Sequence, residues 1–492
     1  MKPSINLLMV KIGTEPGLED IPRTLRSIDS RIKTFGVLSR PDQYHTFDVV
    51  VSSSYESALG AQHEYLRDGL YVRPELFEKI GHAEGRILRM YERVAIQDLS
   101  ELAAPGSPIP PFRDSVDARS QLFLRHAAYW DFALRHHEID AVVAQNYGHN
   151  GYDAVLYEVA TANGLPYMFF HEFRPFQRAQ QMYESVRELE SNALSSSLIE
   201  VARQKFPYLP DSPGRRELME LQVGLRDKPD SPVSTSKPSF VSRVRRLKKF
   251  SDLPQRLARS VRRRRRNARS MRDERESCSG SALPERYLFC ELQSQPNATT
   301  ALKGWMFPDQ RESIAMIAKH LPAGWKLVVK ESDRQWSRMY PRRVGFWSHI
   351  AAVPNVHVVA STSSSRDLLD SSCGLVETSY SSLALRAIQL GIPVIVLGYT
   401  HIGGLAGVRT VVTDADASQA VQDVCSRQGT RLTSEEVTAS LTSFVDQKIT
   451  ASVEGTLSYV PKFPSQSERE QFIRRTITNV SSVIAAWLLL RV

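Results

Sequence analysis

The chain has 492 residues, of which 42% are hydrophobic and 9% aromatic. A single hydrophobic core stops growing near roughly 250 to 300 residues, so this length predicts two domains, and the ordinary apolar content excludes wholesale disorder. Residues 241–275 hold fifteen Lys or Arg and three Asp or Glu, a local charge of +12, so the remainder carries −3 of the total of +9. This distribution excludes the globally basic surface of a dedicated nucleic-acid binder, and no nucleic-acid partner is expected.

The first 206 residues alternate short apolar runs with helix-like segments. The expected strands, rich in branched or aromatic residues, cover residues 5–10, 34–38, 47–51, 139–144 and 167–170. Helical spacing of apolar residues predicts helices at 120–135 and 153–162, and the second ends at Asn163-Gly164, a common helix stop. This alternation is typical of a parallel sheet flanked by helices, so residues 1–206 are predicted to form a Rossmann-like domain.

The N-terminus and the cysteines predict a cytoplasmic protein. The apolar run 5–10 is short, and Lys11 and Glu15 follow it too soon for a signal peptide. The four cysteines stand apart without CxxC or other ligand spacing, which argues against a disulfide framework and against a structural zinc site. A reducing compartment is therefore expected.

Residues 207–285 are rich in Pro, Ser and Arg and are interpreted as a linker. Residues 286–462 again alternate strand and helix patterns and predict a second Rossmann-like domain. Its expected strands cover residues 287–292, 326–329, 356–359, 374–377, 394–397 and 410–412, and its expected helices cover 308–320, 365–371 and 381–390.

The C-terminal residues 463–492 are expected to form a helix that packs back on the body. They contain the apolar run Val480–Leu490, about half of the ~20 residues that span a bilayer. A tail that dips into a membrane is the alternative. The predicted fold class is thus α/β, with two Rossmann-like domains that face each other across a cleft and a basic linker insertion between them.

Residues 378–382, Thr-Ser-Tyr-Ser-Ser, lie between an expected strand and an expected helix. The start of a helix offers unpaired backbone N–H groups and the positive end of the helix dipole, which attract anions such as phosphates. Lys330 ends another strand and is expected to point its ammonium at the same phosphates. Such a site fits the phosphates of an activated sugar, which would be the donor in a transfer reaction. The residues expected to bind this phosphorylated donor are Gln295, Asn297, Lys330, Thr378, Ser379, Ser381, Ser382 and Arg386. For Arg386 a surface salt bridge is the alternative, and for Gln295 and Asn297 a role in turns.

The chain contains several short motifs of polar residues, Pro or Gly next to the expected strands and helices. They are Leu292-Gln-Ser-Gln-Pro296, Asp309-Gln310, Leu321-Pro322, Leu327-Val-Val-Lys330-Glu331, Pro354-Asn-Val356, Thr378-Ser with Ala387–Pro393, and Phe170-His-Glu172-Phe-Arg174-Pro175. These motifs resemble those of the capsule polysaccharide biosynthesis family of GT-B-like glycosyltransferases, which include enzymes that transfer Kdo from a CMP-sugar. The resemblance implies transfer of a sugar, with inversion, from a nucleotide-sugar donor to a glycan or glycolipid acceptor. The chain departs from the family at Asn297, at Ser332-Asp333 and at Arg386, where the family has Glu, His-Pro and Glu.

Glycosyl transfer needs a base for the acceptor hydroxyl. Glu172 is the first candidate and His171 the second, because both follow an expected strand of the N-terminal domain. A structural ion pair between Glu172 and Arg174 is the alternative. The residues expected to contact the acceptor are Asn146, His149, Asp153 and Arg174, and Asp153 could instead serve only as a helix N-cap.

Neither a metal nor a cofactor is expected. The chain has no His/Asp/Glu/Cys cluster with metal-ligand spacing, and its one Asp-x-Asp pattern, Asp414-Ala-Asp416, is interpreted as a turn after a late strand. A metal-independent reaction follows from this interpretation.

Residues 241–275 predict an amphipathic basic helix, because apolar residues recur every three or four positions among the Lys and Arg. A partner with an anionic surface is expected, and the protein would then lie at the inner face of the cytoplasmic membrane. The residues expected to contact lipid are Arg245, Arg246, Lys248, Lys249, Arg263 and Arg264. A solvated linker and an RNA-binding segment are the alternatives.

The leading hypothesis from the sequence is a GT-B glycosyltransferase of surface polysaccharide assembly. A catalytically inactive glycan-binding or scaffolding protein of the same shape is the second hypothesis, favoured by the departures at Ser332-Asp333 and Arg386. A sugar-nucleotide epimerase of similar shape is the third.

Overall fold

The computed structural model divides the chain into two compact units. The first comprises residues 1–225 and 441–492, and the second comprises residues 226–440. The structure describes residues 4–13, 17–38, 46–52, 72–88, 116–148, 151–172, 179–189, 193–205, 261, 265, 268–280, 282–295, 300, 304–332, 335, 342, 345–379, 381–427, 429–450, 452–457, 463 and 465–492.

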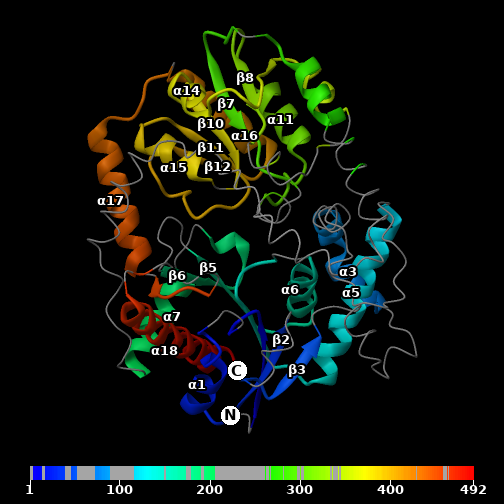
Figure 1. Cartoon of the computed structure of the whole chain (residues 1–492), viewed down its shortest axis with the longest axis vertical. Helices are drawn as coiled ribbons and strands as arrows, with labels where there is room; N and C mark the ends of the chain where they lie inside the picture. The colour runs from blue at the N-terminus through cyan, green and yellow to red at the C-terminus, as the bar shows by residue number, and fades with distance from the viewer. Residues whose placement is uncertain are drawn as a thin grey trace. The chain divides into compact units, whose positions relative to one another are not determined.

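The first unit is built on a seven-stranded sheet (Figure 1). Its strands are β1 (Ile5–Val10), β2 (Ile32–Leu38), β3 (Val49–Ser52), β4 (Ala141–Ala144), β5 (Tyr167–Glu172), β6 (Ala179–Tyr183) and β13 (Val453–Glu454). Their order across the sheet is β13-β6-β5-β4-β1-β2-β3. The strands from β5 to β3 are parallel, whereas β6 pairs antiparallel with both β5 and β13.

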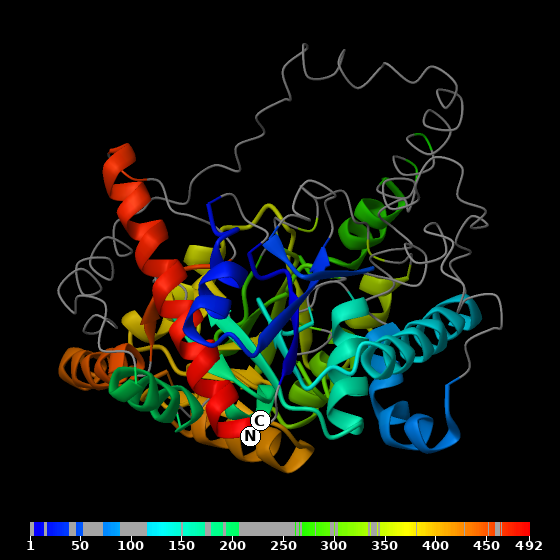
Figure 2. The ribbon, with the colours of Figure 1, turned by 90° about the horizontal axis from the view of Figure 1, so that it is seen from below.

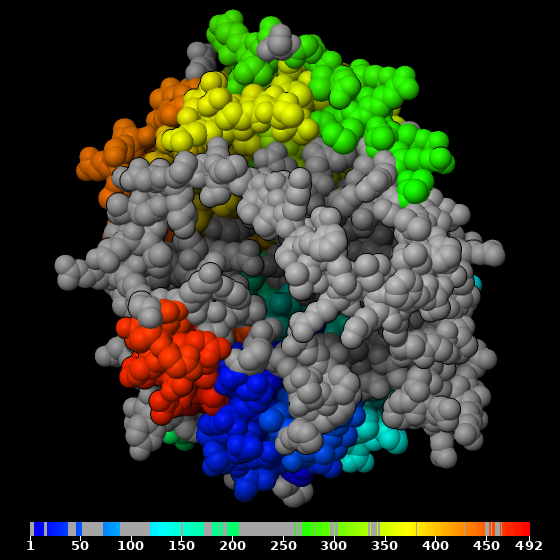
Figure 3. All heavy atoms as spheres, viewed as in Figure 1, coloured from blue at the N-terminus to red at the C-terminus, as the bar shows by residue number. Residues whose placement is uncertain are grey.

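Helices flank this sheet, and the last of them completes its core. They are α1 (Ile21–Ile28), α3 (Pro74–Ile80), α5 (Val116–His136), α6 (Tyr152–Ala162), α7 (Ala193–Lys205) and α18 (Gln466–Arg491). The final helix, α18, packs on α1 and α7 (Figure 2). Its residues Val480, Val483 and Trp487 are fully buried in one cluster with residues of β1. In the space-filling view, the red C-terminal residues accordingly lie against the blue N-terminal ones (Figure 3).

The second unit holds a six-stranded, wholly parallel sheet. Its strands are β7 (Tyr287–Glu291), β8 (Lys326–Lys330), β9 (Val356–Val358), β10 (Gly374–Thr378), β11 (Val394–Leu397) and β12 (Val408–Val411). Its helices are α11 (Gln310–Lys319), α13 (Phe346–Ala351), α14 (Ser365–Asp370), α15 (Ser382–Gln389) and α16 (Asp414–Ser426), and α17 (Ser434–Thr450) leads back to the first unit.

Both sheets have the strand order of a Rossmann fold. In the second unit the order β9-β8-β7-β10-β11-β12 corresponds to 3-2-1-4-5-6, and the first six strands of the chain follow the same scheme. The prediction of two Rossmann-like domains is therefore confirmed. In such sheets the direction of winding reverses between strands 1 and 4, and ligands bind outside the carboxyl ends of the strands at this switch point. The switch points lie between β1 and β4 and between β7 and β10.

Every strand predicted from the apolar runs is present within a few residues of its expected position. The C-terminal run lies in helix α18, and Val480, Val483 and Trp487 of this helix belong to the buried cluster of the first unit. Within the described parts of the chain, no helix combines the length and the apolar character needed to cross a membrane. The second domain was expected to end near residue 462. The second compact unit ends at Ser440, and residues 441–492 belong to the first unit.

Replacement of Trp487 by alanine is expected to destabilise the first unit by about 3 to 5 kcal/mol, because it opens a cavity in the core and removes an indole N–H donor. The indole is fully buried, and its Nε1 donates to Glu184 over 2.8 Å. Chemical denaturation followed by circular dichroism measures the change. Leu489→Ala on the same helix is the control, because that side chain is 48% exposed. Equal stability of the two variants would contradict the packing of α18.

Candidate functional site

Strained backbone gathers at the switch points of both sheets. Five of the described non-glycine residues have a positive φ: Lys11, Glu138, Trp305, Asn355 and Ser379. Lys11 directly follows β1, Ser379 directly follows β10, and Trp305 lies in the connection after β7. Such conformations cost about 1 to 3 kcal/mol each and gather at functional sites. Three of the five strained residues thus mark the carboxyl ends where the fold is expected to bind ligands.

A buried glutamate sits at the end of β10 in the second unit. Glu377 is 1% exposed, and its Oε1 accepts a hydrogen bond from the Ser381 hydroxyl. Its Oε2 is buried and has no hydrogen-bond partner among the described residues. Burial raises the pKa of Glu377 to about 8, with a smaller contribution from the Glu291 carboxylate, although the Ser381 hydroxyl acts in the opposite direction. The side chain is therefore mostly an uncharged acid at neutral pH.

A small pocket between α11 and the sheet reaches this glutamate. It has room for about one water molecule. The Gln310 Oε1 atom is buried there and, like Glu377 Oε2, lacks a hydrogen-bond partner in the described part of the chain. The lining residues are Cys290, Glu291, Leu292, Gln310, Ser313, Ile314, Ile317, Leu327, Val376, Glu377, Thr378 and Leu397. The pocket thus lies on β7 and β10, the two strands of the switch point.

The helix after β10 begins close to where the sequence predicted it. Ser381 is the N-cap of α15, and its Oγ accepts hydrogen bonds from Leu383 N and Ala384 N over 2.9 and 3.3 Å. Two N–H groups of the first turn of α15 are thereby already satisfied, and Ser379 N donates to the Leu397 carbonyl, so the helix dipole is the principal attraction that remains. Ser382 is exposed, and Thr378 and Ser379 are buried beside it. A phosphate contact at Ser379–Ser382 stays a prediction.

Arg386 lies one turn into α15 and is half-buried. Its Nε atom is buried without a hydrogen-bond partner among the described residues. An unsatisfied guanidinium N–H group is costly to bury, and an anionic or carbonyl ligand would satisfy it. The proposed ligand contact of Arg386 is untested.

Lys330 ends β8, but its ammonium is buried rather than presented at the surface. Nζ lies 3.2 Å from Oε1 of Glu291, its register partner on β7, and donates to the Glu331 carbonyl. The Ser365 hydroxyl donates to the same Glu291 oxygen over 2.6 Å. The ammonium thus neutralises a carboxylate at the switch point, and its expected contact with phosphate stays a prediction.

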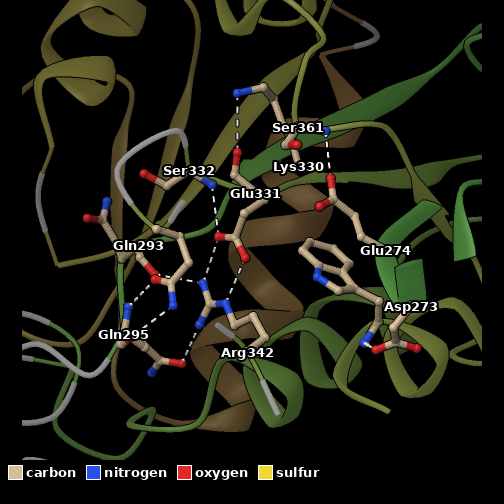
Figure 4. Close-up of polar contacts among 11 residues, drawn as sticks. Asp273, Glu274, Gln293, Gln295, Lys330, Glu331, Ser332, Arg342 and Ser361 are labelled. Atoms are coloured by element: carbon tan, nitrogen blue, oxygen red, sulfur yellow. Dashed lines mark hydrogen bonds and ion pairs between the residues drawn. The ribbon is translucent and has the colours of Figure 1, made fainter. Parts of the chain in front are cut away.

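A buried ion pair between Glu331 and Arg342 lies beside Lys330 (Figure 4). Arg342 donates to both oxygens of Glu331 over 2.8 and 2.9 Å, and neither side chain is more than 6% exposed. The same guanidinium donates to Gln295 Oε1 and to the Gln293 carbonyl, each over 2.9 Å. Arg342 therefore ties the segment after β8 to the segment after β7.

The amide of Gln295 is engaged within the unit. Besides accepting from Arg342, it donates through Nε2 to the Pro308 carbonyl over 2.8 Å, and its backbone exchanges hydrogen bonds with the Gln335 side chain. These bonds orient the loop after β7. A contact between Gln295 and a donor stays a prediction, and Asn297 lies outside the described residues.

In the first unit the structure brings Asp153 to Lys11, a residue that the sequence analysis did not single out. Lys11 Nζ lies 3.2 Å from Asp153 Oδ2 and 5.5 Å from the centre of the Tyr152 ring. Burial lowers the pKa of Lys11, but Asp153 and Tyr152 together raise it above its ordinary value. Asn146 Oδ1 is buried in the same connection without a partner among the described residues. A polar centre therefore occupies the switch point between β1 and β4.

The remaining predicted residues of the first unit are described only in part. His171 lies on β5 with its ring 6.2 Å from that of Tyr183, and Glu172 ends the same strand. The side chain of Glu172 lies outside the described residues, as do His149 and Arg174. The predicted lipid contacts of the basic segment also lie outside them: Arg245, Arg246, Lys248, Lys249, Arg263 and Arg264.

The described end of the basic segment is held on the second unit by two acidic side chains. Residues 268–277 are helical. The Asp273 carboxylate accepts from Gly345 N and Trp347 N at the start of α13, and the Glu274 carboxylate accepts from Ser361 N (Figure 4). Arg269, Arg272 and Arg275 are exposed. The attached helix thus presents arginines to solvent.

Several residues of the site were missed by sequence reasoning: Lys11, Glu291, Glu331, Arg342 and Glu377. Glu291 and Glu377 could have been noticed in the sequence, because each is an acidic residue near the end of an otherwise apolar strand pattern. A charge in a buried strand is tolerated where it is paired or neutralised, as both prove to be. The described residues contain no group of three or more His, Cys, Asp or Glu placed to hold a metal ion.

No protein-family model matches the chain, and no curated protein sequence matches it. Solved structures similar to it include the UDP-GlcNAc 2-epimerase from Methanocaldococcus jannaschii, at 8% identity and a TM-score of 0.26, with 88% of this chain and 97% of that chain covered. KpsC from Thermosulfurimonas dismutans, a beta Kdo 2,7 transferase, is 10% identical with a TM-score of 0.26, and 65% and 89% are covered. Anabaena Alr3699/HepE in complex with UDP and glucose is 10% identical with a TM-score of 0.24, and 96% and 99% are covered.

These similarities are too loose to assign an activity, and the fold assignment rests on the strand orders of the two sheets. The likeness to the capsule polysaccharide biosynthesis family accordingly remains a resemblance of short motifs.

Replacement of Glu377 by glutamine is expected to change how stability depends on pH. Between its ordinary value of 4.5 and about 8, the Glu377 carboxyl keeps its proton in the folded protein and releases it on unfolding. The free energy of unfolding therefore falls as pH rises through this window, by about 1.4 kcal/mol per pH unit. The glutamine amide of the variant has no proton to release, so Glu377→Gln gains stability relative to the parent from pH 5 to pH 8.

Thermal unfolding of both proteins at pH 5.5, 6.5, 7.5 and 8.5 measures this gain. Glu285→Gln, which alters an exposed carboxylate just before β7, is the control and is expected to keep a constant difference from the parent. A constant difference for Glu377→Gln as well would show that Glu377 is charged in the folded protein.

Replacement of Arg342 by methionine is expected to cost about 3 to 5 kcal/mol, because it leaves the Glu331 carboxylate buried without a counter-charge. Glu331→Met in the Arg342→Met background is expected to recover part of this loss. Denaturant unfolding of the four proteins of this cycle measures the coupling. Additive losses would mean that the two side chains do not interact.

Proposed function

We propose that the chain is a glycosyltransferase that uses a nucleotide-sugar donor. The observation that carries the proposal is the switch point of the second sheet, where an uncharged buried acid, a strained serine and the start of α15 stand together. A Rossmann sheet with these groups suits a phosphorylated ligand, because the helix dipole attracts its charge while the neutral Glu377 does not repel it.

The loops after β1 and β7 favour a nucleotide sugar over a dinucleotide. The sequence after β7 reads Leu292-Gln-Ser-Gln-Pro296 and the sequence after β1 reads Lys11-Ile-Gly-Thr14, so neither loop holds the Gly-x-Gly-x-x-Gly pattern that lets a pyrophosphate approach the first helix. The anion-attracting helix start follows β10 instead. We assign the donor phosphates to Thr378, Ser379 and Ser382, with Arg386 as a further ligand.

The donor site needs groups that stabilise the negative charge of the departing nucleotide. The start of α15 and the Arg386 guanidinium supply them in this proposal. The pair of Lys330 and Glu291 and the pair of Arg342 and Glu331 serve as positioning residues, because they hold the loops after β7 and β8 in place.

The acceptor side is assigned to the first unit. Its polar centre of Lys11, Asp153 and Asn146 offers a cation, a carboxylate and an unpartnered carbonyl to a hydroxylated ligand. Glu172 and His171, at the end of β5, stay our candidates for the base that deprotonates the acceptor hydroxyl. The short motifs shared with the capsule polysaccharide family support a surface glycan or a lipid-linked glycan as the acceptor.

Association with an anionic membrane is part of the proposal. The exposed arginines of the helix at residues 268–277 and the charge of +12 over residues 241–275 support it, because each basic residue near an anionic leaflet contributes about 1 kcal/mol. Flotation with vesicles of phosphatidylcholine and phosphatidylserine compares the full chain with a form that lacks residues 241–267. The shortened form is expected to float less, and equal flotation of the two would contradict a role of the basic segment.

Release of nucleotide from a panel of CMP-, UDP- and GDP-sugars tests the reaction. Acceptor-dependent release with one donor is the expected result. Conversion of a donor without acceptor would instead identify an epimerase, and the absence of any turnover would identify a binding protein.

Ser381→Ala is expected to lower kcat/KM for the donor about tenfold, since the loss of an N-cap and of its bond to Glu377 costs on the order of 1.4 kcal/mol. Ser465→Ala removes the same kind of cap from α18 in the other unit and is the matched control. Equal losses of kcat/KM in both variants would show that α15 is not part of the donor site.

A further inference from the structure

Two aromatic rings meet at the carboxyl end of the second sheet. Trp305 belongs to the connection between β7 and α11, and Tyr399 lies two residues after Leu397, the last residue of β11. Their ring centroids are 5.5 Å apart, with an angle of 68° between the planes. Both residues are half-buried, and Met306 beside them is 67% exposed. An aromatic surface that is partly open therefore adjoins the switch point.

The backbone at Trp305 is strained. Its φ of 51° is a left-handed conformation that a bulky residue rarely adopts. The preceding Gly304 is packed so closely that a Cβ atom there would lie 2.3 Å from the Thr300 carbonyl oxygen and 3.0 Å from the Thr378 methyl group. Only glycine fits, so the loop is pressed against Thr378 at the end of β10. Trp305 thus directly follows a residue that packs against Thr378, one of the residues assigned to the phosphates.

Trp305 differs from the other tryptophans that the structure describes. Trp130, Trp347 and Trp487 are fully buried and Trp325 is 4% exposed, as expected of side chains that serve the core. A strained, partly open indole contributes less to the core, whereas it presents a rigid apolar face to a ligand.

We propose that Trp305, with the Tyr399 ring packed against it at a steep angle, forms a stacking platform for the nucleobase of the donor. This inference rests on the proposed function, because it assumes that a nucleotide binds at the switch point. Aromatic side chains stack on the π-face of any base, and each such contact contributes about 1 to 3 kcal/mol. Gly304, which precedes Trp305, packs against Thr378, and β11, which precedes Tyr399, pairs with β10. In this inference the base contacts the rings while the phosphates contact Thr378–Ser382.

Isothermal titration calorimetry with UDP, CMP and GDP, and with ribose 5-phosphate as a probe without a base, tests the platform. The affinity of Trp305→Ala for the preferred nucleotide is expected to fall between about tenfold and about a hundredfold. Trp305→Phe, which keeps a ring, is expected to stay within about threefold of the parent. Ribose 5-phosphate is expected to bind the parent and Trp305→Ala alike. Quenching of tryptophan emission by the nucleotide, lost in Trp305→Phe, gives a second readout.

Met306→Ala changes the same loop without removing a ring and is the matched control. An unchanged nucleotide affinity in Trp305→Ala would overturn the platform and leave the proposed function intact. An equal loss for ribose 5-phosphate would also overturn it, because the indole would then only support the loop. Weaker binding of the nucleotide sugar with unchanged binding of the nucleotide would place the sugar, not the base, on the rings. No binding of any nucleotide to the parent protein would reject the proposed function as well.

Discussion

Opposite charges are paired at the carboxyl edge of the second sheet, and the candidate site depends on this pairing. Lys330 neutralises Glu291, and Arg342 neutralises Glu331. The pair of Lys330 and Glu291 joins β8 to β7. Arg342 also donates to Gln295 and to the Gln293 carbonyl in the loop after β7, so the edge is fixed from two directions. Unpaired charges would be costly here, since desolvation of one ion in a protein interior costs several kcal/mol. Among the described residues Glu377 has no such counter-ion, and burial instead raises its pKa to about 8, so that the carboxyl is mostly neutral at pH 7.

Residues with strained backbone lie at the carboxyl ends of the strands, which supports this edge of each sheet as the ligand-binding surface. Lys11, Trp305 and Ser379 adopt left-handed backbone at strand 1 or strand 4 of their sheets. Surrounding contacts hold each of them: the Asp153 carboxylate binds Lys11, the tight packing of Gly304 precedes Trp305, and the Leu397 carbonyl accepts from Ser379 N. Two units of different sequence thus place unusual conformations at the equivalent position of one topology, where a common strand order predicts ligands.

Much of the fold could be predicted from local pattern, because a buried parallel strand leaves a short run of branched residues that an adjacent helix pattern delimits. The strands β6 and β13 escaped prediction. β6 reads Ala-Gln-Gln-Met-Tyr, whose polar residues hide its burial, and β13 has two residues that pair across the chain with Gln180 and Ala179.

The site was harder to predict than the fold. Residues 378–382 could be found because they lie between a predicted strand and a predicted helix. The ion pairs could not be found in this way, because they join residues far apart in the sequence, such as Lys11 and Asp153. Lys330 was recognised at the end of β8, yet its neighbour Glu291 could be found only from the register of β7 and β8. Burial and pairing are properties of the assembled sheet, and the sequence pattern alone does not encode them.

The return of the chain to the first unit has a consequence for biosynthesis. The core around β1 includes side chains from Val480 to Leu488, which are made only after the whole of the second unit. A ribosome that has finished residues 1–225 has therefore released a sheet whose apolar face still lacks its covering helix. The second unit, continuous in sequence, can collapse first, and the earlier half must wait, exposed to chaperones, until α18 leaves the exit tunnel.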